Sequence, residues 1–250
     1  MLLVFGLALN LAGALPAAAQ IPVTPEDSAG WLIGPATAGP IPLSEFVQGP
    51  ETPPLGSGSL AVRIDEANSK LGLGRNDRNG DDIDLLTALS YDVYLSPTAT
   101  NANPFYVNLY IDTTGAGNSH DLRLDFAPPT SVVGWQSFDA RTAPFWLADG
   151  MGPAQSLDDQ LTSFPDARLA PAPFNVTDFP AIILNMGDTA SSYIGFDGAI
   201  DNVVIADDVY DFELSLIEPV VAIPTLGEAG AVALALLLAL GAVAFLRRRH

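Results

Sequence analysis

The chain has 250 residues, no cysteine and a formal net charge of −19, from 29 acidic and 10 basic residues. Without cysteine it has no disulfide, no thiolate nucleophile and no cysteine-ligated metal site. The negative field repels nucleic acid and anionic lipid, so we expect no nucleic-acid partner. The fold must therefore depend on a hydrophobic core, which a domain of about 180 residues can bury.

The N-terminal segment predicts export. Residues 1–19 are apolar and close on Pro16-Ala17-Ala18-Ala19, ahead of the polar Gln20. A hydrophobic run that ends in Ala-x-Ala is typical of a secretory signal peptide, which the secretion machinery recognises and signal peptidase cuts, here after Ala19. The alternative is an N-terminal membrane anchor.

Residues 20–54 are rich in proline and glycine and show little periodicity. Proline cannot donate a hydrogen bond to a neighbouring strand and is confined to sheet edges. We therefore predict a leader that contains one or two short edge strands.

The segment 55–217 shows the alternation of apolar and polar residues that predicts half-buried strands. It is clearest in three stretches, 89–95, 105–112 and 121–126. The glycine-rich run 113–119 is expected to join the last two in a hairpin.

Two further strands are predicted at 179–186 and 193–205, and residues 210–216 are either a closing strand or a stalk. One short helix is expected through about residue 163, because Ser156 can cap it and an acidic residue follows three positions later. Short strands separated by Gly/Pro turns indicate an all-β fold, an antiparallel β-sandwich of jelly-roll type.

Two short stretches carry a resemblance to known sandwich domains. The sequence GFDGAIDNVVI, residues 195–205, resembles the last strand of carbohydrate-binding-module-like jelly rolls. The sequence GWQSFDA, residues 134–140, resembles a mid-sheet strand of secreted PEP-CTERM-type β-sandwich proteins. The resemblance implies the same fold class as the alternation.

Candidate catalytic residues are scarce, and we expect no enzyme. Glu45, Glu51 and Glu66 lack the paired spacing of a glycosidase. The sole histidine of the domain, His120, lies between Ser119 and Asp121, and adjacent side chains on a strand point to opposite faces, which excludes a catalytic triad there.

The run 76–84 is a candidate calcium loop, because Asp and Asn oxygens are ligands that Ca²⁺ prefers. The candidate ligands are Asp77, Asn79 and Asp81, completed by Asp82 or Asp84. The alternative is a tight Asn79–Gly80 turn whose acidic residues are simply solvated. The jelly-roll resemblance implies Asp201 as a second candidate for calcium.

Three tyrosines are predicted to lie opposite the apolar set of their strands: Tyr94, Tyr106 and Tyr110. If strands 89–95 and 105–112 pair, these side chains share one face with Asp92 and Asn108. Such a face could contact a ligand such as an extracellular polysaccharide. The alternative is that other strands and loops cover it.

After a spacer at 218–222, residues 223–250 predict a membrane-associated tail. Residues 229–246 carry no charged side chain, and as a helix they cover roughly 27 Å, about the thickness of a bilayer core. Arg247, Arg248 and Arg249 follow within the basic end 247–250, which fixes the C-terminus on the cytoplasmic side and the acidic domain outside.

The box before this span, residues 223–230, resembles the IPTL-CTERM sorting signals of Gram-negative bacteria. The matching positions are Ile223, Pro224, Thr225, Leu226, Glu228, Gly230 and the three arginines. Ala229 stands where tryptophan is usual, which is the one departure from the pattern. The resemblance implies that an exosortase-type transpeptidase processes the tail, and Pro224 favours the extended backbone that such an enzyme could grip.

Together these features predict an exported, surface-sorted and non-catalytic protein with a structural or binding role. It would be anchored transiently in the inner membrane and then reach the cell surface or extracellular matrix. Two alternatives remain: a carbohydrate-binding or carbohydrate-processing module, and a membrane-tethered protein whose tail is never cut.

Overall fold

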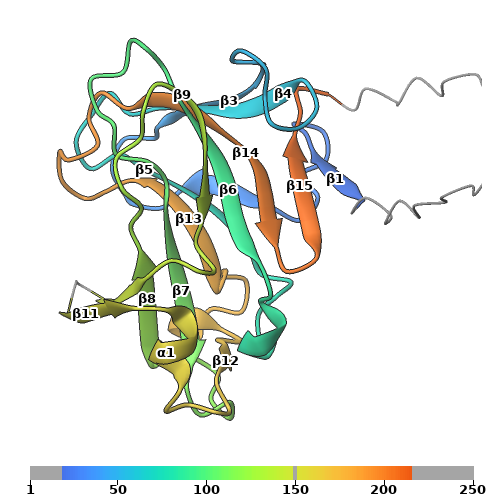
Figure 1. Cartoon of the computed structure of the whole chain (residues 1–250), viewed down its shortest axis with the longest axis vertical. Coiled ribbons are helices and arrows are strands. Elements are labelled where there is room, and N and C mark those ends of the chain that lie inside the picture. Colours follow the sequence, from blue (N-terminus) through green and yellow to red (C-terminus); the bar gives the residue numbers. More distant parts are fainter. Residues whose placement is uncertain (1–18, 149–150, 216–250) are drawn as a thin grey trace, which may run out of the picture. The chain divides into compact units, whose positions relative to one another are not determined.

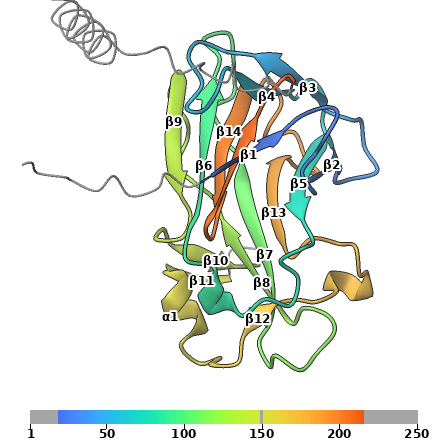
Figure 2. The same ribbon diagram turned by 90° about the vertical axis from the view of Figure 1, so that its right-hand side faces the viewer.

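The segments in which apolar and polar residues alternate form two β-sheets that pack face to face (Figures 1 and 2). The computed structural model describes residues 19–148 and 151–215. Along β6 (Leu89–Leu95), Tyr91 and Val93 point into the core and are almost fully buried. The predicted all-β sandwich is confirmed, because nearly all the regular structure in these residues is strand.

The first sheet, here called sheet A, has seven strands. Its central strand is β14 (Asp197–Ile205), which pairs with β6 along one edge. The other edge of β14 pairs with β4 (Gly58–Arg63) over its first half and with β15 (Asp208–Phe212) over its second half. The outer strands are β9 (Gly134–Asp139) beside β6, β3 (Leu43–Gln48) beside β4, and β1 (Gln20–Val23) parallel to β15.

The second sheet, here called sheet B, has eight strands. Its order is β11 (Met151–Gln155), β10 (Phe145–Leu147), β8 (Leu122–Phe126), β7 (Tyr106–Asp112), β13 (Ile182–Gly187), β5 (Lys70–Arg75) and β2 (Leu32–Pro35), with β12 (Arg168–Leu169) pairing the end of β7. The β7–β8 hairpin is confirmed, with Val107 opposite Phe126. The short helix is also confirmed as α1 (Leu157–Leu161), where the Ser156 side chain accepts a hydrogen bond from the Asp159 amide.

The prolines and glycines of residues 20–54 do not prevent pairing. This segment contributes β1, β2 and β3, and each of these strands has a single neighbour. All three are thus edge strands, the positions in which proline is tolerated.

Two expectations about strand neighbours are wrong. Strands β6 and β7 do not pair, because β6 lies between β14 and β9 in sheet A, whereas β7 lies in sheet B. Strand β9 is not in the middle of its sheet either: it pairs with β6 alone and forms an edge.

The inner faces of the two sheets form one hydrophobic core. Sheet A contributes Leu60 and Ile200, and sheet B contributes Leu71, Leu109 and Leu184, all at most 1% exposed. Since inward and outward residues alternate on a strand, the other half of each strand lies on an outer face. The outer faces carry the polar groups considered next.

Candidate functional site

The predicted sorting residues, from Ile223 to Arg249, lie outside the described residues, as do the signal peptide at 1–18 and the span at 229–246. Within the described part of the chain, no helix is long and apolar enough to cross a membrane. The side chains available for a site are therefore those of the sandwich.

The loop 76–84 does not form the predicted calcium shell. Asp77 is ion-paired with Arg75, and Asp81 lies 3.6 Å from the Arg78 guanidinium. Both ends of the Asn79 side-chain amide form hydrogen bonds with the backbone. Its nitrogen donates to the Phe179 carbonyl at 2.8 Å, and its oxygen accepts from the Ala181 amide at 2.9 Å. The alternative of a tight Asn79–Gly80 turn is confirmed, because the Asp81 amide donates to the Arg78 carbonyl at 3.1 Å and Gly80 has a positive φ. Asp77 and Asp81 are not merely solvated, since both face arginines.

The two other predicted ligands of this loop lie at the surface. Asp82 and Asp84 are exposed, Asp84 within a single 3-10 turn, Ile83–Leu85. Across residues 19–148 and 151–215, no group of three or more His, Asp or Glu side chains is arranged to hold a metal ion.

Asp201 lies in a different and fully buried environment. Its carboxylate accepts hydrogen bonds from the Phe212 and Leu55 amides at 3.0 and 3.1 Å, so backbone groups engage both oxygens. Burial raises the pKa of Asp201 to about 7, against the effect of these hydrogen bonds.

Asp211 and Glu213 lie near Asp201, below the loop 49–57. Burial, followed by the neighbouring Glu213, raises the pKa of Asp211 to about 6. One Asp211 oxygen is buried without a partner among the described residues, whereas Glu213 accepts from the Ser57 amide at 2.6 Å. Gly56 makes this approach possible, because a Cβ there would lie 1.6 Å from a Glu213 oxygen. Sequence reasoning missed Asp211 and Glu213, which only the folding of the loop over β15 brings together.

The three predicted tyrosines do not share a face, because β6 and β7 belong to different sheets. Tyr94 lies on the outer face of sheet A, where its ring packs against Trp135 at 5.6 Å. Its hydroxyl donates to the Glu51 carboxylate at 3.3 Å. Loop 49–57 covers this side chain, as the covered-face alternative expected.

Tyr106 and Tyr110 lie on the outer face of sheet B. The Tyr106 hydroxyl donates to the Gly187 carbonyl at 3.1 Å. Tyr110 packs edge-on against Phe179, Phe174 and His120, with ring centroids 4.9–5.5 Å apart. His120 is thus part of an aromatic cluster, and its Nδ1 accepts from the Phe174 amide at 3.4 Å.

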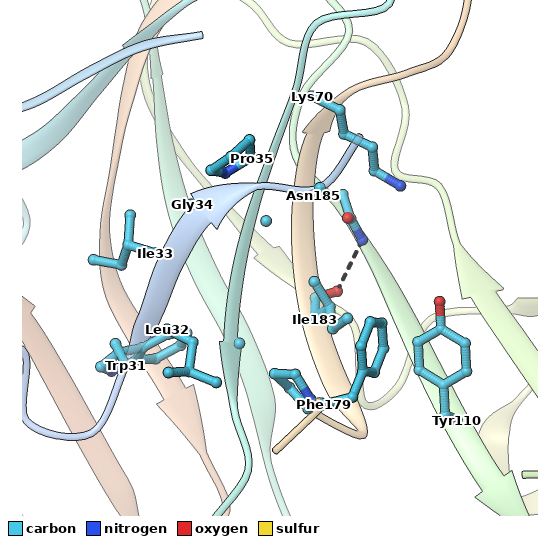
Figure 3. Close-up of a pocket in the computed structure, with 14 residues that line it drawn as sticks. Trp31, Leu32, Ile33, Gly34, Pro35, Lys70, Tyr110, Phe179, Ile183 and Asn185 are labelled. Atoms are coloured by element: carbon cyan, nitrogen blue, oxygen red, sulfur yellow. Dashed lines mark hydrogen bonds between the residues drawn. The ribbon is translucent and has the colours of Figure 1, made fainter. Parts of the chain in front are cut away.

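A groove of about 480 Å³ runs over this face beside Tyr110 (Figure 3). Glycines form its floor, because Gly34 of β2 is opposite Gly72 of β5 and Gly72 is opposite Asn185 of β13. Gly74, one outward position further along β5, is opposite Ile183. The backbone is open at Gly34, where a Cβ would meet no atom within 4 Å, whereas Pro180 covers Gly74.

The walls of the groove differ in character. On one side stand apolar residues of β2 and the segment after it: Leu32, Pro35 and Ala36. On the other side stand Phe179, Tyr110, Asn185 and Lys70, and Figure 3 shows the Tyr110 hydroxyl on the same side as the Asn185 amide and the Lys70 ammonium.

Lys70 is the only lysine in the chain. Its ammonium lies 5.3 Å from the centre of the Tyr106 ring, and it has neither a hydrogen bond nor an ion pair with any described residue. Burial lowers the pKa of Lys70, and Arg123 lowers it further, whereas Asp125 and Asp188 raise it. Lys70 is thus a partly desolvated cation that contacts the Tyr106 ring but has no carboxylate partner among the described residues.

Two further polar groups border the groove without a protein partner in the described chain. Tyr110 is only 7% exposed, yet its hydroxyl forms no hydrogen bond with any described residue. The Asn185 nitrogen donates to the Asn108 side chain at 2.8 Å and to the Ile183 carbonyl, which leaves its oxygen available. Sequence reasoning identified Tyr110 but missed Lys70 and Asn185. The available signal was the strand LGLGR, in which leucines alternate with glycines.

The comparison with protein families concerns the other end of the chain. The family described as the IPTL-CTERM motif matches residues 221–250. The chain carries an IPTL-CTERM sorting signal. This confirms the resemblance of the Ile223–Leu226 box to these signals, and it supports an exported surface protein that is processed at its C-terminus by a sorting enzyme. No curated protein matches the chain.

Proposed function

We propose that this chain is a non-catalytic binding protein of the cell surface or extracellular matrix, delivered there by removal of its IPTL-CTERM tail. The observation that carries the proposal is the motif at residues 221–250. The motif follows the sandwich in the sequence. This order supports two separate roles, in which the tail directs the protein to the cell surface and the sandwich acts outside the cell.

The enzyme in this proposal is an exosortase-type transpeptidase. The sequence of the box contains Pro224, and proline disfavours helix in the residue before it. An extended segment next to a membrane span would be accessible to a membrane-embedded enzyme. Arg247, Arg248 and Arg249 hold the span in one orientation, with the sandwich on the far side of the inner membrane.

A binding role is favoured over catalysis by the side chains of the sandwich. His120 is packed against Phe174 and Tyr110, and Asp121 is occupied by the Thr113 amide and hydroxyl. The groove on sheet B presents unpaired polar groups over a glycine floor, which suits a ligand that is held rather than transformed.

The test is to replace Arg247, Arg248 and Arg249 together by Gln in the native host and to follow the protein by cell fractionation and immunoblotting. The altered chain should accumulate uncleaved at the inner membrane, and the surface fraction should fall. Arg63→Gln serves as the matched control, because Arg63 is an exposed arginine of the sandwich and should leave processing unchanged. A normal yield of processed surface protein from the triple variant would overturn the proposed role of the tail.

A further inference from the structure

We propose that the groove on the outer face of sheet B binds a saccharide that carries a carboxylate, such as a uronic-acid residue, with Lys70 as the partner of that carboxylate. This inference rests on the binding role proposed above and names the ligand class. It involves only described residues of β2, β5, β7 and β13.

The shape of the groove suits a ring. Its volume of about 480 Å³ lies within the range of roughly 300–1,000 Å³ typical of small-molecule sites. The paired outward positions Gly34 and Gly72 carry no side chain, and a Cβ at Gly34 would meet no atom within 4 Å, so the backbone is accessible there across two neighbouring strands. A flat ligand can therefore approach the sheet, with its apolar C–H face against Phe179 and the aliphatic wall of β2.

The charge of the groove selects an acid. Five arginines of the described domain already have a carboxylate partner within 4 Å: Arg63, Arg75, Arg78, Arg123 and Arg141. Lys70 forms no such pair in that part of the chain. An ammonium that has lost part of its hydration and has no direct counter-charge gains most from a ligand carboxylate.

The uncharged polar groups select hydroxyls. The Tyr110 hydroxyl is a donor with no acceptor among the described residues, and the Asn185 oxygen is an acceptor with no donor. Burial raises the pKa of Tyr110, which keeps the hydroxyl protonated at neutral pH. A sugar offers hydroxyls that both accept and donate, so one ring can satisfy both groups.

The net charge of −19 limits the length of the ligand. A densely charged polyanion would be repelled by the carboxylates around the sandwich. At physiological salt, charges further than about 8 Å are largely screened. A single carboxylate in the groove therefore interacts with Lys70 and with the charges that surround it, namely Arg123, Asp125 and Asp188. The geometry therefore favours a short acidic segment or terminal acidic sugar over a long polyanion.

The experiment uses the single lysine as a probe. In the full chain, labelled with ¹³C-lysine and kept in detergent micelles, the ε-methylene signal reports on Lys70 alone. Trigalacturonic acid should shift this signal in a saturable manner and raise the pKa of Lys70, because a carboxylate stabilises the ammonium. The methyl-esterified trisaccharide, which has the same rings without charge, should bind at least about tenfold more weakly.

Two variants locate the site in the groove. Lys70→Gln, followed by calorimetry, should weaken trigalacturonate binding by about tenfold or more, as expected for the loss of one charge-assisted hydrogen bond. Arg63→Gln removes the same charge from the other sheet and should change affinity by less than about twofold. Gly34→Leu should abolish binding without unfolding the chain, because a Cβ at Gly34 meets no atom within 4 Å.

Three outcomes would overturn the inference while leaving C-terminal processing untouched. The first is an unshifted Lys70 signal up to about 10 mM trigalacturonate. The second is equal binding of the acid and its methyl ester. The third is a saturable shift by triglutamate stronger than that by trigalacturonate, which would indicate an acidic peptide as the occupant.

Discussion

Tyr94 on sheet A and Tyr110 on sheet B invite comparison, because each points away from the core and each is 7% exposed. Their hydroxyls differ. The Tyr94 hydroxyl donates to Glu51, whereas the Tyr110 hydroxyl has no partner in the described chain. The two tyrosines are thus equally buried, but only the Tyr94 hydroxyl has a hydrogen-bond partner among the described residues. The Tyr110 hydroxyl remains available to a ligand.

The cause of the difference is loop 49–57. On sheet A, its Pro50 carbonyl accepts from the Trp135 indole at 3.0 Å, and its Leu55 and Ser57 amides donate to Asp201 and Glu213. On sheet B, the described residues leave a groove over Gly34 and Gly72. One outer face is therefore covered by a loop, whereas the other retains the groove in which we propose that a ligand binds.

The largest expected effect on stability comes from removing contacts that hold loop 49–57 on sheet A. Trp135→Ala removes the packing against Tyr94 and the hydrogen bond to Pro50. The free energy of unfolding should fall by about 2–3 kcal/mol, less than for a fully buried tryptophan because Trp135 is half-buried. This corresponds to a melting temperature roughly 5–10 °C lower, measured by circular dichroism.

The control for Trp135→Ala is Leu43→Ala on β3, where the side chain is 55% exposed. It should leave the melting temperature nearly unchanged. Equal effects of the two substitutions would show that the loop does not stabilise sheet A.

The second prediction concerns pH and the carboxylates below the loop. The pKa of Asp211 is raised to about 6 in the fold, so between about pH 4 and pH 6 the folded state holds a proton that the unfolded state has released. Stability should therefore fall as pH rises through this window, and the raised pKa of Asp201, about 7, extends the fall toward neutrality.

Asp211→Asn should remove part of the fall in stability that accompanies rising pH. Its melting temperature should exceed that of the unaltered chain near pH 7.5 and approach it below about pH 4, with exposed Asp82→Asn as the control. Parallel pH profiles for the Asp211→Asn variant and the unaltered chain would contradict the assigned burial of the charge.

The smallest effects distinguish the two tyrosines directly. Tyr94→Phe leaves Glu51 without its donor and should cost about 0.5–1.5 kcal/mol. Tyr110→Phe removes a hydroxyl without a protein partner, so the change in stability should stay within about 0.5 kcal/mol. Thermal melting of both variants checks this, and a larger loss for Tyr110→Phe would indicate a structural partner for its hydroxyl.

Local patterns in the sequence were enough to predict several elements. Leucine, tyrosine and valine alternate with polar residues along β6, and the same period fixes which side chains of β7 face the core. Ser156 signals the start of α1 because its hydroxyl meets the amide three residues later.

Strand neighbours could not be predicted, because alternation specifies a face and not a partner. Strands β6 and β7 have the same pattern, yet they lie in different sheets. Strand β6 pairs with β14 and strand β7 pairs with β13, and both partners are distant in the sequence. The candidate site depends on this assignment: Gly34, Gly72 and Asn185 meet only when β2, β5 and β13 lie side by side.

Release of the exported sandwich from its C-terminal sorting tail is measured by the intact mass of the protein recovered from the cell surface. We expect a species that begins at Gln20 and ends within or before the Ile223–Leu226 box, with residues 229–250 absent apart from any group joined at the new C-terminus. A surface species that retains Arg249 would contradict it and would leave a protein anchored by an uncut tail.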